Sequence, residues 1–122
     1  MELYKVNVSE PAEYDLRGIA SYISRNLCEP EVAIKMTHTL ERAIINLEHT
    51  PHKYALLSEN SLAAEGLRKF MVKNYLVFFT IDEVSKIVNV ERVLYARRDW
   101  VRILSSSHPS PPDTPPTTPE QS

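Results

Sequence analysis

Cysteine and glycine are both scarce in this sequence, and each shortage excludes a class of site. Cys28 is the one cysteine, so the chain forms no internal disulfide, which fits a reducing compartment. Gly18 and Gly66 are the two glycines, too few for a glycine-rich phosphate-binding loop. The four histidines do not cluster with cysteines or carboxylates, and we therefore expect no metal site and no cofactor.

Long apolar runs and targeting signals are missing as well. No run approaches the ~20 apolar residues of a membrane-spanning helix. The first residues, MELYKVNV, lack the basic and then apolar pattern of a signal peptide. We expect a chain that has no membrane partner and stays in the cytoplasm. Its 122 residues, 43% of them hydrophobic, are enough for one folded domain.

The first half of the sequence predicts a strand followed by two helices. Residues 4–8 alternate between apolar and polar side chains, as in a half-buried strand. Ser9 suits the N-cap of a helix that runs to about Asn26, and a second helix follows from about Glu31 to Glu48. Each helix carries an apolar stripe at spacings of three and four residues, so each buries one face. The stripes are Ala12, Leu16, Ile19, Ala20, Ile23 and Leu27, then Ala33, Met36, Leu40, Ala43, Ile44 and Leu47.

Three runs rich in β-branched and aromatic residues follow, and they predict the rest of the sheet. These are Leu67–Val72, Tyr75–Ile81 and Ile87–Tyr95. The two residues between the first and second runs predict a tight hairpin in which Asn74 tolerates a positive φ. The second run is apolar at nearly every position, which places it centrally, covered at least in part on both faces.

The third run alternates, and this alternation predicts which side chains face the core. Val88, Val90 and Leu94 are expected to point inward. The opposite, half-polar face then carries Asn89, Glu91, Val93, Tyr95 and Arg97. Arg68 begins the first run, so a meander of the three strands is expected to bring Arg68, Tyr95, Arg97 and Arg98 near one another.

The remaining segments complete an α+β fold. The loop 49–65 lacks periodicity, and we expect Leu56, Leu57 and Leu62 to anchor it and Gly66 to give an unusual backbone geometry at its end. Residues 99–104 predict a short terminal turn or helix. The last 18 residues include six prolines and no aliphatic or aromatic residue, which predicts a disordered tail. The expected organisation is thus a domain over residues 1–104 and a tail over 105–122. Cys28 is expected to fill the junction between the helices.

Positive charge is concentrated in the sheet-forming part of the chain. Residues 66–104 contain eight Lys and Arg against four Asp and Glu, whereas the whole chain has a net charge of −2. This distribution is compatible with a local basic surface. Cations on strand edges also discourage edge-to-edge pairing, so ordinary solvated edges explain the pattern equally well.

The cationic and aromatic side chains of the sheet are the only candidates for chemistry. Arginine and lysine bind phosphate and stabilise the extra negative charge of a pentacoordinate phosphorus. A tyrosine whose pKa is lowered by nearby cations assists proton transfer, which suits metal-free RNA cleavage. Two alternatives stay open: Arg68 and Arg97 pair with carboxylates, and Tyr95 is simply half-buried.

The order of these segments resembles the RelE/ParE superfamily of bacterial toxins, over about residues 1–104. The resemblance rests on Gly66-Leu67-Arg68 at the entry to the sheet. On the two helices it rests on Ala12, Asp15-Leu16, Ile19 and Tyr22-Ile23, and then on Leu40, Ala43-Ile44, Leu47 and Pro51. It rests also on Asn74-Tyr75-Leu76-Val77-Phe78-Phe79 and on Arg92-Val93-Leu94-Tyr95-Ala96-Arg97-Arg98-Asp99-Trp100. It implies a type II toxin–antitoxin module in which an antitoxin wraps and inactivates a small toxin.

Within the superfamily, the resemblance implies two activities. RelE-like members cleave mRNA in the ribosomal A site without a metal, whereas ParE-like members inhibit DNA gyrase. The first reading implies that Arg68, Arg97 and Tyr95 are catalytic and that Lys69, Lys73 and Arg98 bind RNA. However, Ile103 occupies the position of the RelE-like tyrosine near the C-terminus, and the chain is not strongly basic. Gyrase inhibition, and a toxin remnant without activity, therefore remain as alternatives.

Overall fold

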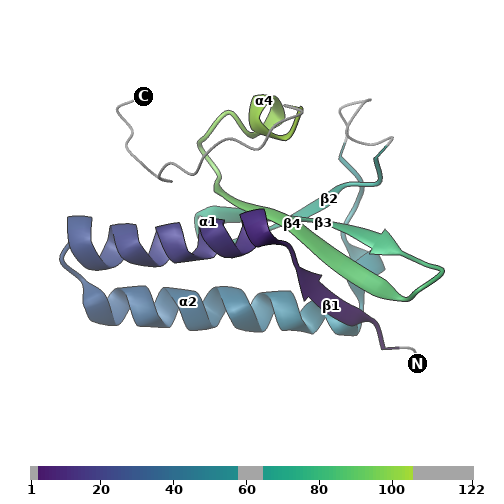
Figure 1. Cartoon of the computed structure of the whole chain (residues 1–122), viewed down its shortest axis with the longest axis horizontal. Helices are drawn as coiled ribbons and strands as arrows, with labels where there is room; N and C mark the ends of the chain where they lie inside the picture. The colour runs from purple at the N-terminus through teal and green to yellow at the C-terminus, as the bar shows by residue number, and fades with distance from the viewer. Residues whose placement is uncertain (1–2, 58–64, 106–122) are drawn as a thin grey trace.

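A four-stranded sheet with helices on both faces forms the body of the protein. The computed structural model describes residues 3–57 and 65–105. The strand order is β1-β4-β3-β2, with β1 (Lys5–Val8) parallel to β4 (Ile87–Tyr95). β2 (Arg68–Val72) and β3 (Tyr75–Asp82) complete the sheet through antiparallel pairs. Two long helices lie against one face and a short helix, α4, lies on the other (Figure 1). This arrangement confirms the predicted α+β class and the antiparallel-rich sheet.

The two long helices form the predicted hairpin. α1 (Glu10–Ser21) begins at Ser9, whose Oγ accepts a hydrogen bond of 3.1 Å from the Ala12 N–H. A π-helical segment, Tyr22–Asn26, continues it. α2 (Pro30–Ile45) then runs back and ends in a 3₁₀ turn, Asn46–Glu48. None of the described helices is long and apolar enough to cross a membrane.

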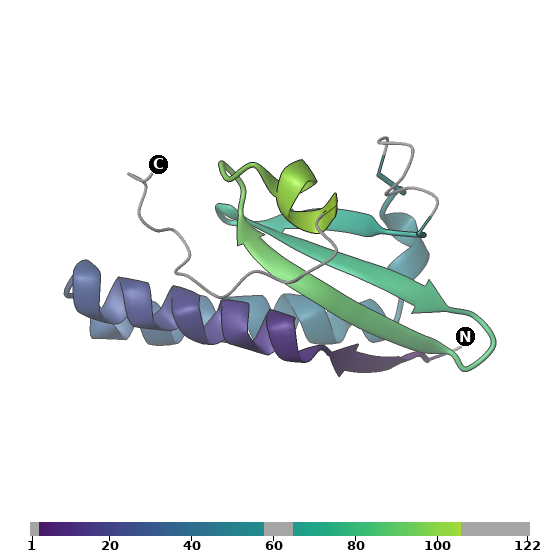
Figure 2. The same cartoon turned by 45° about the horizontal axis from the view of Figure 1, so that its top comes forward.

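Most of the two predicted apolar stripes are buried, but the tip of the hairpin is not. Leu27 is 51% exposed, and Cys28, which has a φ of 55°, is exposed as well. The predictions that Leu27 belongs to the buried stripe and that Cys28 fills the helix–helix junction are therefore wrong. The physical reason is visible in Figures 1 and 2: the hairpin extends past the end of the sheet, so its tip has no sheet to pack against.

β3 is buried on both faces, as its continuous apolar sequence predicts. Its Val77 and Phe79 belong to the core formed with α1 and α2. Leu76 and Phe78 belong to a second cluster, which packs against α4 (Trp100–Ser105). In this second cluster the apolar side chains of α4 cover the face of the sheet that the long helices leave open. The structured end of the chain thus supplies the outer layer of the sheet.

A β-bulge in β4 overturns the predicted facing of that strand. Phe78 pairs with Arg92 but Phe79 pairs with Val90, so Glu91 is an extra residue in β4. Because one extra residue inverts the alternation, Val88, Val90 and Val93 all face the long helices, whereas Leu94 faces α4. The expectation that Val88, Val90 and Leu94 share one face is wrong. So is the expectation that Val93 and Tyr95 line an open, half-polar face, since both pack in the helix-side core.

Helix α1 closes the edge of β4 that β1 leaves uncovered. β1 pairs only as far as Val90. Beyond that point the Ser9 hydroxyl donates to the Glu91 carbonyl over 3.0 Å. The Asp15 carboxylate then accepts hydrogen bonds from the Val93 N–H at 2.9 Å and from Nε and Nη2 of Arg92 at 2.7 and 2.9 Å. Side chains of a helix thereby satisfy backbone groups that a neighbouring strand would otherwise pair.

The connections between elements show where backbone strain lies. Gly66 has a φ of 80°, which confirms the unusual geometry predicted there. In the β2–β3 hairpin the positive φ falls on Lys73, at 57°, and not on Asn74 as predicted. A non-glycine residue in this region costs about 1–2 kcal/mol. In the β3–β4 turn, Lys86 has a φ of 58°.

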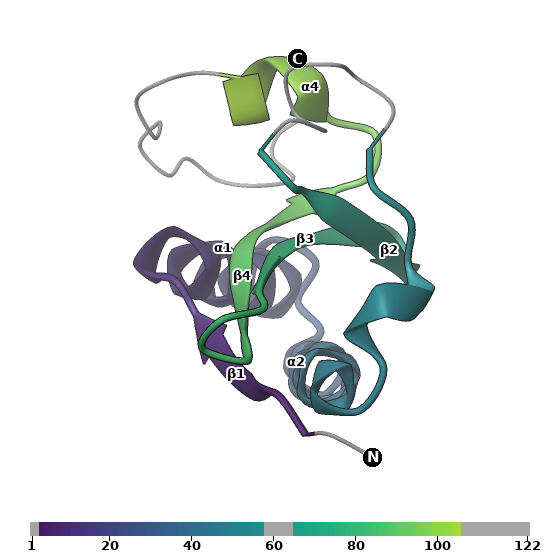
Figure 3. The same cartoon turned by 90° about the vertical axis from the view of Figure 1, so that its right-hand side faces the viewer.

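The loop after α2 runs beside the outer edge of β2 (Figure 3). A short 3₁₀ turn, Pro51–Lys53, leads into it, and Leu56 then forms an isolated antiparallel bridge with Arg68. Leu57 is buried and anchors the segment as predicted, whereas Leu56 is 48% exposed and anchors it through its backbone bridge to Arg68 and not through a buried side chain. Leu62 and the tail beyond Ser105 lie outside the described residues.

We predict that Asp15→Ala lowers the free energy of unfolding by about 3–5 kcal/mol, because it leaves the largely buried Arg92 guanidinium without its partner. The two side chains are 15% and 11% exposed, so little water is available to replace the lost bonds. The measurement is urea denaturation followed by circular dichroism. The matched control is Asp99→Ala, which removes a solvent-exposed ion pair with Arg102 and is expected to change stability by about 0–1 kcal/mol. Equal effects of the two substitutions would contradict the prediction.

Candidate functional site at the end of the sheet

The six residues predicted to form a site lie in four different places. Arg68 is on the helix-facing side of β2, because its cross-strand partner Phe79 belongs to the helix-side core. Lys69 is on the opposite side, with Phe78 and α4. Tyr95 packs in the helix-side core. The remaining three, Lys73, Arg97 and Arg98, lie in the turns at one end of the sheet.

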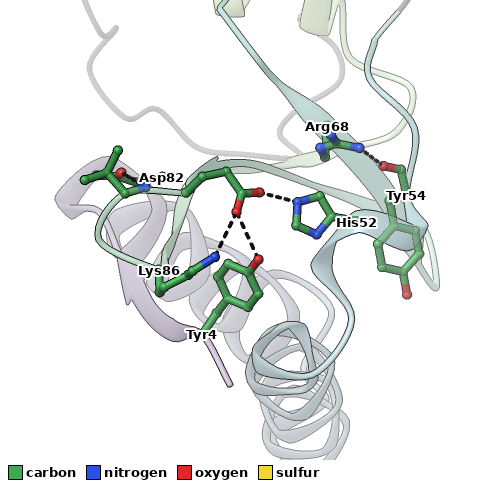
Figure 4. A network of polar contacts seen from close by, with 8 residues as sticks. Tyr4, His52, Tyr54, Arg68, Asp82 and Lys86 are labelled. Atoms are coloured by element: carbon green, nitrogen blue, oxygen red, sulfur yellow. Dashed lines mark hydrogen bonds and ion pairs between the residues drawn. The ribbon is translucent and has the colours of Figure 1, made fainter. Parts of the chain in front are cut away.

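Arg68 binds a backbone group of its own chain. Its Nη1 donates to the carbonyl oxygen of Tyr54 over 2.6 Å, as Figure 4 shows. The Tyr54 ring stacks on Phe70, with ring centroids 4.6 Å apart and an interplanar angle of 19°. The guanidinium therefore holds the loop that follows α2 against β2. Neither of the two open alternatives for Arg68, a phosphate-binding surface or a carboxylate partner, describes this contact.

The same loop is fastened at a second point by the carboxylate of Glu83, in the turn after β3. Glu83 accepts hydrogen bonds from the Tyr4 hydroxyl at 3.1 Å and from Lys86 Nζ at 3.5 Å, and it also contacts His52 Nε2 (Figure 4). These bonds, that from His52 foremost, lower the pKa of Glu83 below its ordinary value of 4.5. The N-terminus, the loop and the β3–β4 turn thus meet at one exposed carboxylate.

Tyr95 forms a group of phenols with Tyr75 and Tyr22 at the helix-facing side of the sheet. The Tyr75 and Tyr95 rings are an antiparallel cross-strand pair, with centroids 5.8 Å apart in an edge-to-face arrangement. Burial, followed by the neighbouring Tyr95 and Tyr22, raises the pKa of Tyr75 above its ordinary value of 10.0. The raised pKa keeps the Tyr75 phenol protonated, which is the reverse of what a general base requires.

The register of the sheet separates Arg68 from Tyr95. Arg68 pairs with Phe79, whereas Tyr95 pairs with Tyr75. Those two positions of β3 lie about 13 Å apart along the strand, and β2 and β4 lie about 10 Å apart across it. The two Cα atoms are therefore separated by about 16 Å. The expectation that Arg68, Tyr95, Arg97 and Arg98 lie near one another is wrong for Arg68.

The other cations come together at the end of the sheet, which we call the sheet-end cluster: Lys73, Arg97 and Arg98. The Ala96 N–H donates a hydrogen bond of 2.9 Å to the carbonyl oxygen of Asn74. This bond joins the β2–β3 turn to the chain that leaves β4. Lys73 and Arg97 each stand one residue from this bond and are exposed. Arg98 lies close enough to Asp15 for its charge to lower the pKa of that carboxyl, although burial has the larger, opposite effect and raises it above 3.8.

Lys69 contributes to the layer that contains α4. Its Nζ lies 5.5 Å from the centre of the Trp100 ring, a distance suited to a cation–π contact. Trp100 in turn packs on Phe78, with centroids 5.4 Å apart. Residues 3–57 and 65–105 contain no group of three or more histidine, cysteine, aspartate or glutamate side chains arranged to hold a metal ion.

A comparison with known protein families identifies this architecture. The family model described as ParE toxin of the type II toxin–antitoxin system, parDE, matches residues 6–100, which is most of the chain. The chain belongs to the ParE toxin family. It is therefore a toxin of a type II toxin–antitoxin system, and the resemblance to the RelE/ParE superfamily is confirmed. None of the curated proteins matches the toxin's sequence.

Solved structures share the fold of the toxin at low sequence identity. The chromosomal ParDE system of P. aeruginosa superposes with a TM-score of 0.65 at 16% identity, covering 78% of this chain and 98% of that one. A mutant of the E. coli RelE toxin in the free state gives 0.57 at 14% identity, covering 82% and 90%. The RelBE2 toxin–antitoxin complex of Mycobacterium tuberculosis gives 0.55 at 20% identity, covering 78% and 93%. At these identities the likeness concerns the fold alone.

Sequence reasoning did not identify the roles of three residues that hold parts of the toxin together, Asp15, Tyr54 and Glu83, although Asp15 is among the residues that carry the family resemblance. Each contacts a residue distant in sequence, so no local spacing announces the contact. Asp15 gave a partial signal, because a carboxylate three positions after Ala12 lies beside the buried stripe of α1 and needs a partner there. Tyr54 acts through its backbone carbonyl, which no sequence pattern identifies.

We predict that Glu83 stabilises the toxin above pH 4.5 and that this contribution is lost as the pH falls through the lowered pKa of the folded state. The sign follows because the folded protein binds this proton less tightly than the unfolded chain. The measurement is the urea midpoint of the wild type and of Glu83→Gln, from about pH 5 down to about pH 3. The difference between the two proteins is expected to shrink as the pH falls. A difference that stays constant over this range would count against the network.

Proposed function

We propose that this toxin inhibits DNA gyrase by binding to it, without cleaving a bond itself. The observation that carries the proposal is the separation of the residues expected to catalyse RNA cleavage. Arg68 is engaged with the Tyr54 carbonyl, the Tyr95 phenol packs beside two other phenols, and the Cα atoms of Arg68 and Tyr95 lie about 16 Å apart. Phosphoryl-transfer catalysis requires its groups to converge on one phosphorus atom within hydrogen-bonding distance. The match to the ParE family and the implied gyrase target support the same conclusion.

We also propose an antitoxin as the partner that controls the toxin. Two of the structural relatives, the P. aeruginosa ParDE system and the M. tuberculosis RelBE2 complex, are named as toxin–antitoxin systems. Both events take place where gyrase works, in the cytoplasm.

We predict that the purified toxin inhibits supercoiling by gyrase and leaves translated mRNA intact. The first measurement is a plasmid supercoiling assay with detection of trapped DNA breaks, and the second is toeprinting on ribosomes engaged in translation. Inhibition of gyrase with uncut message is the expected pair of results. Cuts in the ribosomal A site, with gyrase unaffected, would instead establish the mRNA endonuclease activity implied for RelE-like members.

We predict further that Tyr95→Phe arrests growth as strongly as the wild type. The substitution keeps the ring that packs against Tyr75 and removes only the hydroxyl that a proton-transfer role would require. The measurement is colony formation after induction, with equal expression checked by immunoblot. Tyr22→Phe, in the same group of phenols, is the matched control. A loss of toxicity of about tenfold or more in Tyr95→Phe alone would revive a catalytic role for that phenol.

A further inference from the structure

We propose that the sheet-end cluster binds phosphate groups of duplex DNA, with Lys73 and Arg97 as the principal contacts. The inference rests on the proposed function, because a gyrase inhibitor works beside the DNA that gyrase holds. It adds to that function a contact between the toxin and the nucleic acid itself. Three observations carry it: the charge balance at this end of the sheet, the joining of two turns, and the backbone of Lys73.

The charge balance leaves positive charge at the end of the sheet. Within residues 3–57 and 65–105, no carboxylate forms an ion pair with Lys73 or Arg97. Asp99, two residues after Arg97, forms its ion pair with Arg102, and Asp15 is engaged with Arg92 and influenced by Arg98. An anion arriving at Lys73 and Arg97 therefore does not have to displace a carboxylate of the toxin. The guanidinium offers a paired set of donors to phosphate oxygens and the lysine adds a point charge.

The joined turns hold the two cations in a fixed relation. The 2.9 Å hydrogen bond between the Ala96 N–H and the Asn74 carbonyl fastens the hairpin turn to the chain leaving β4. Just after β4, the Arg98 N–H donates a hydrogen bond of 3.0 Å to the Tyr95 carbonyl. This bond closes the turn that carries Arg97. A site whose backbone is already fixed loses less conformational entropy on binding. Figure 2 shows both turns side by side at the end of the sheet, above the long helices.

The backbone at Lys73 indicates that its charge has a use beyond the turn. Lys73 has a φ of 57°, a conformation that glycine and asparagine adopt far more readily than lysine. The turn itself would be better formed by either of those residues. Lys73 is exposed, so burial of its aliphatic stem does not explain the choice. An anionic ligand accounts for a cation on this strained backbone beside the Arg97 guanidinium, which has no carboxylate partner among residues 3–57 and 65–105.

Phosphodiester groups fit this cluster better than the carboxylates of a protein partner. The two turns form the end of a sheet and present a narrow cationic edge, and Met71 on β2 is the exposed large apolar side chain that lies nearest to it in sequence among the described residues. A protein partner buries apolar area at the core of its interface, but a DNA backbone is contacted through charge alone. The slight negative charge of the whole chain is consistent with contact through one local patch.

The test measures binding of the toxin to a short fluorescein-labelled duplex DNA of mixed sequence by fluorescence anisotropy, at several salt concentrations. The double variant Lys73→Asn with Arg97→Gln is expected to bind at least tenfold more weakly, with the slope of log affinity against log salt reduced by about 1–2. Lys73→Arg with Arg97→Lys keeps both charges and is expected to bind within about threefold of the wild type. Lys35→Asn removes an equal charge from the exposed surface of α2 and is the control for net charge.

Stability provides a readout that separates loss of a site from loss of the fold. Lys73→Asn is expected to raise the Tm, because asparagine tolerates the left-handed backbone, while DNA affinity falls. Weaker binding that appears only together with a lowered Tm would overturn the inference. So would unchanged affinity in the double variant, absent DNA binding by the wild type, or competition by oligoglutamate as effective as that by an unlabelled duplex.

Failure of this inference is distinguishable from failure of the proposed function. If the double variant still inhibits gyrase fully and binds DNA as the wild type does, the DNA contact is wrong and gyrase inhibition stands. If the wild type leaves gyrase unaffected but binds duplex DNA through Lys73 and Arg97, the target is wrong and the phosphate site stands.

Discussion

The contact of Asp15 with β4 is the constraint on which the rest of the structure depends. One carboxylate accepts three hydrogen bonds, two from Arg92 and one from the Val93 N–H, directly after the bulge at Glu91. It fixes α1 along an edge that would otherwise present unpaired backbone groups. The last part of β4, and with it the chain that carries Arg97, is positioned by this contact. The contact of Asp15 with β4 therefore helps to set the packing of α1, the register of β4 and the position of the cationic end of the sheet.

The bulge also explains how one sheet serves two cores. By inverting the alternation of β4, it turns Val93 toward the long helices and Leu94 toward α4. β3 needs no such correction because it is apolar on both faces. The sheet therefore has a helical layer on each of its two faces. Its cationic side chains lie at the edges of the sheet and in the turns. The architecture displays positive charge at the end of the sheet, and this is the surface that the proposed binding to DNA phosphates would use.

Sequence alone predicted the elements, their order and the family, because apolar periodicity and turn residues are local signals. The helix N-cap at Ser9, the central place of β3 and the positive φ at Gly66 were all readable in this way. The neighbours of Arg68 and Tyr95 were not. One extra residue in β4 is invisible in an alternating run, yet it changes which face every later side chain occupies. Likewise, the partner of Arg68 is a backbone carbonyl, which every residue of the chain possesses.

The exposed tip of the helical hairpin has a practical consequence. Because Cys28 is the single cysteine of the chain and is exposed there, one thiol-reactive probe attaches at one known position without any substitution. The side chain makes no contact with either core cluster, so a maleimide dye or nitroxide label there leaves the packing of the sheet untouched. Cys28 is thus a native labelling site. A label there allows assembly with a much larger target to be followed by single-molecule fluorescence or electron paramagnetic resonance.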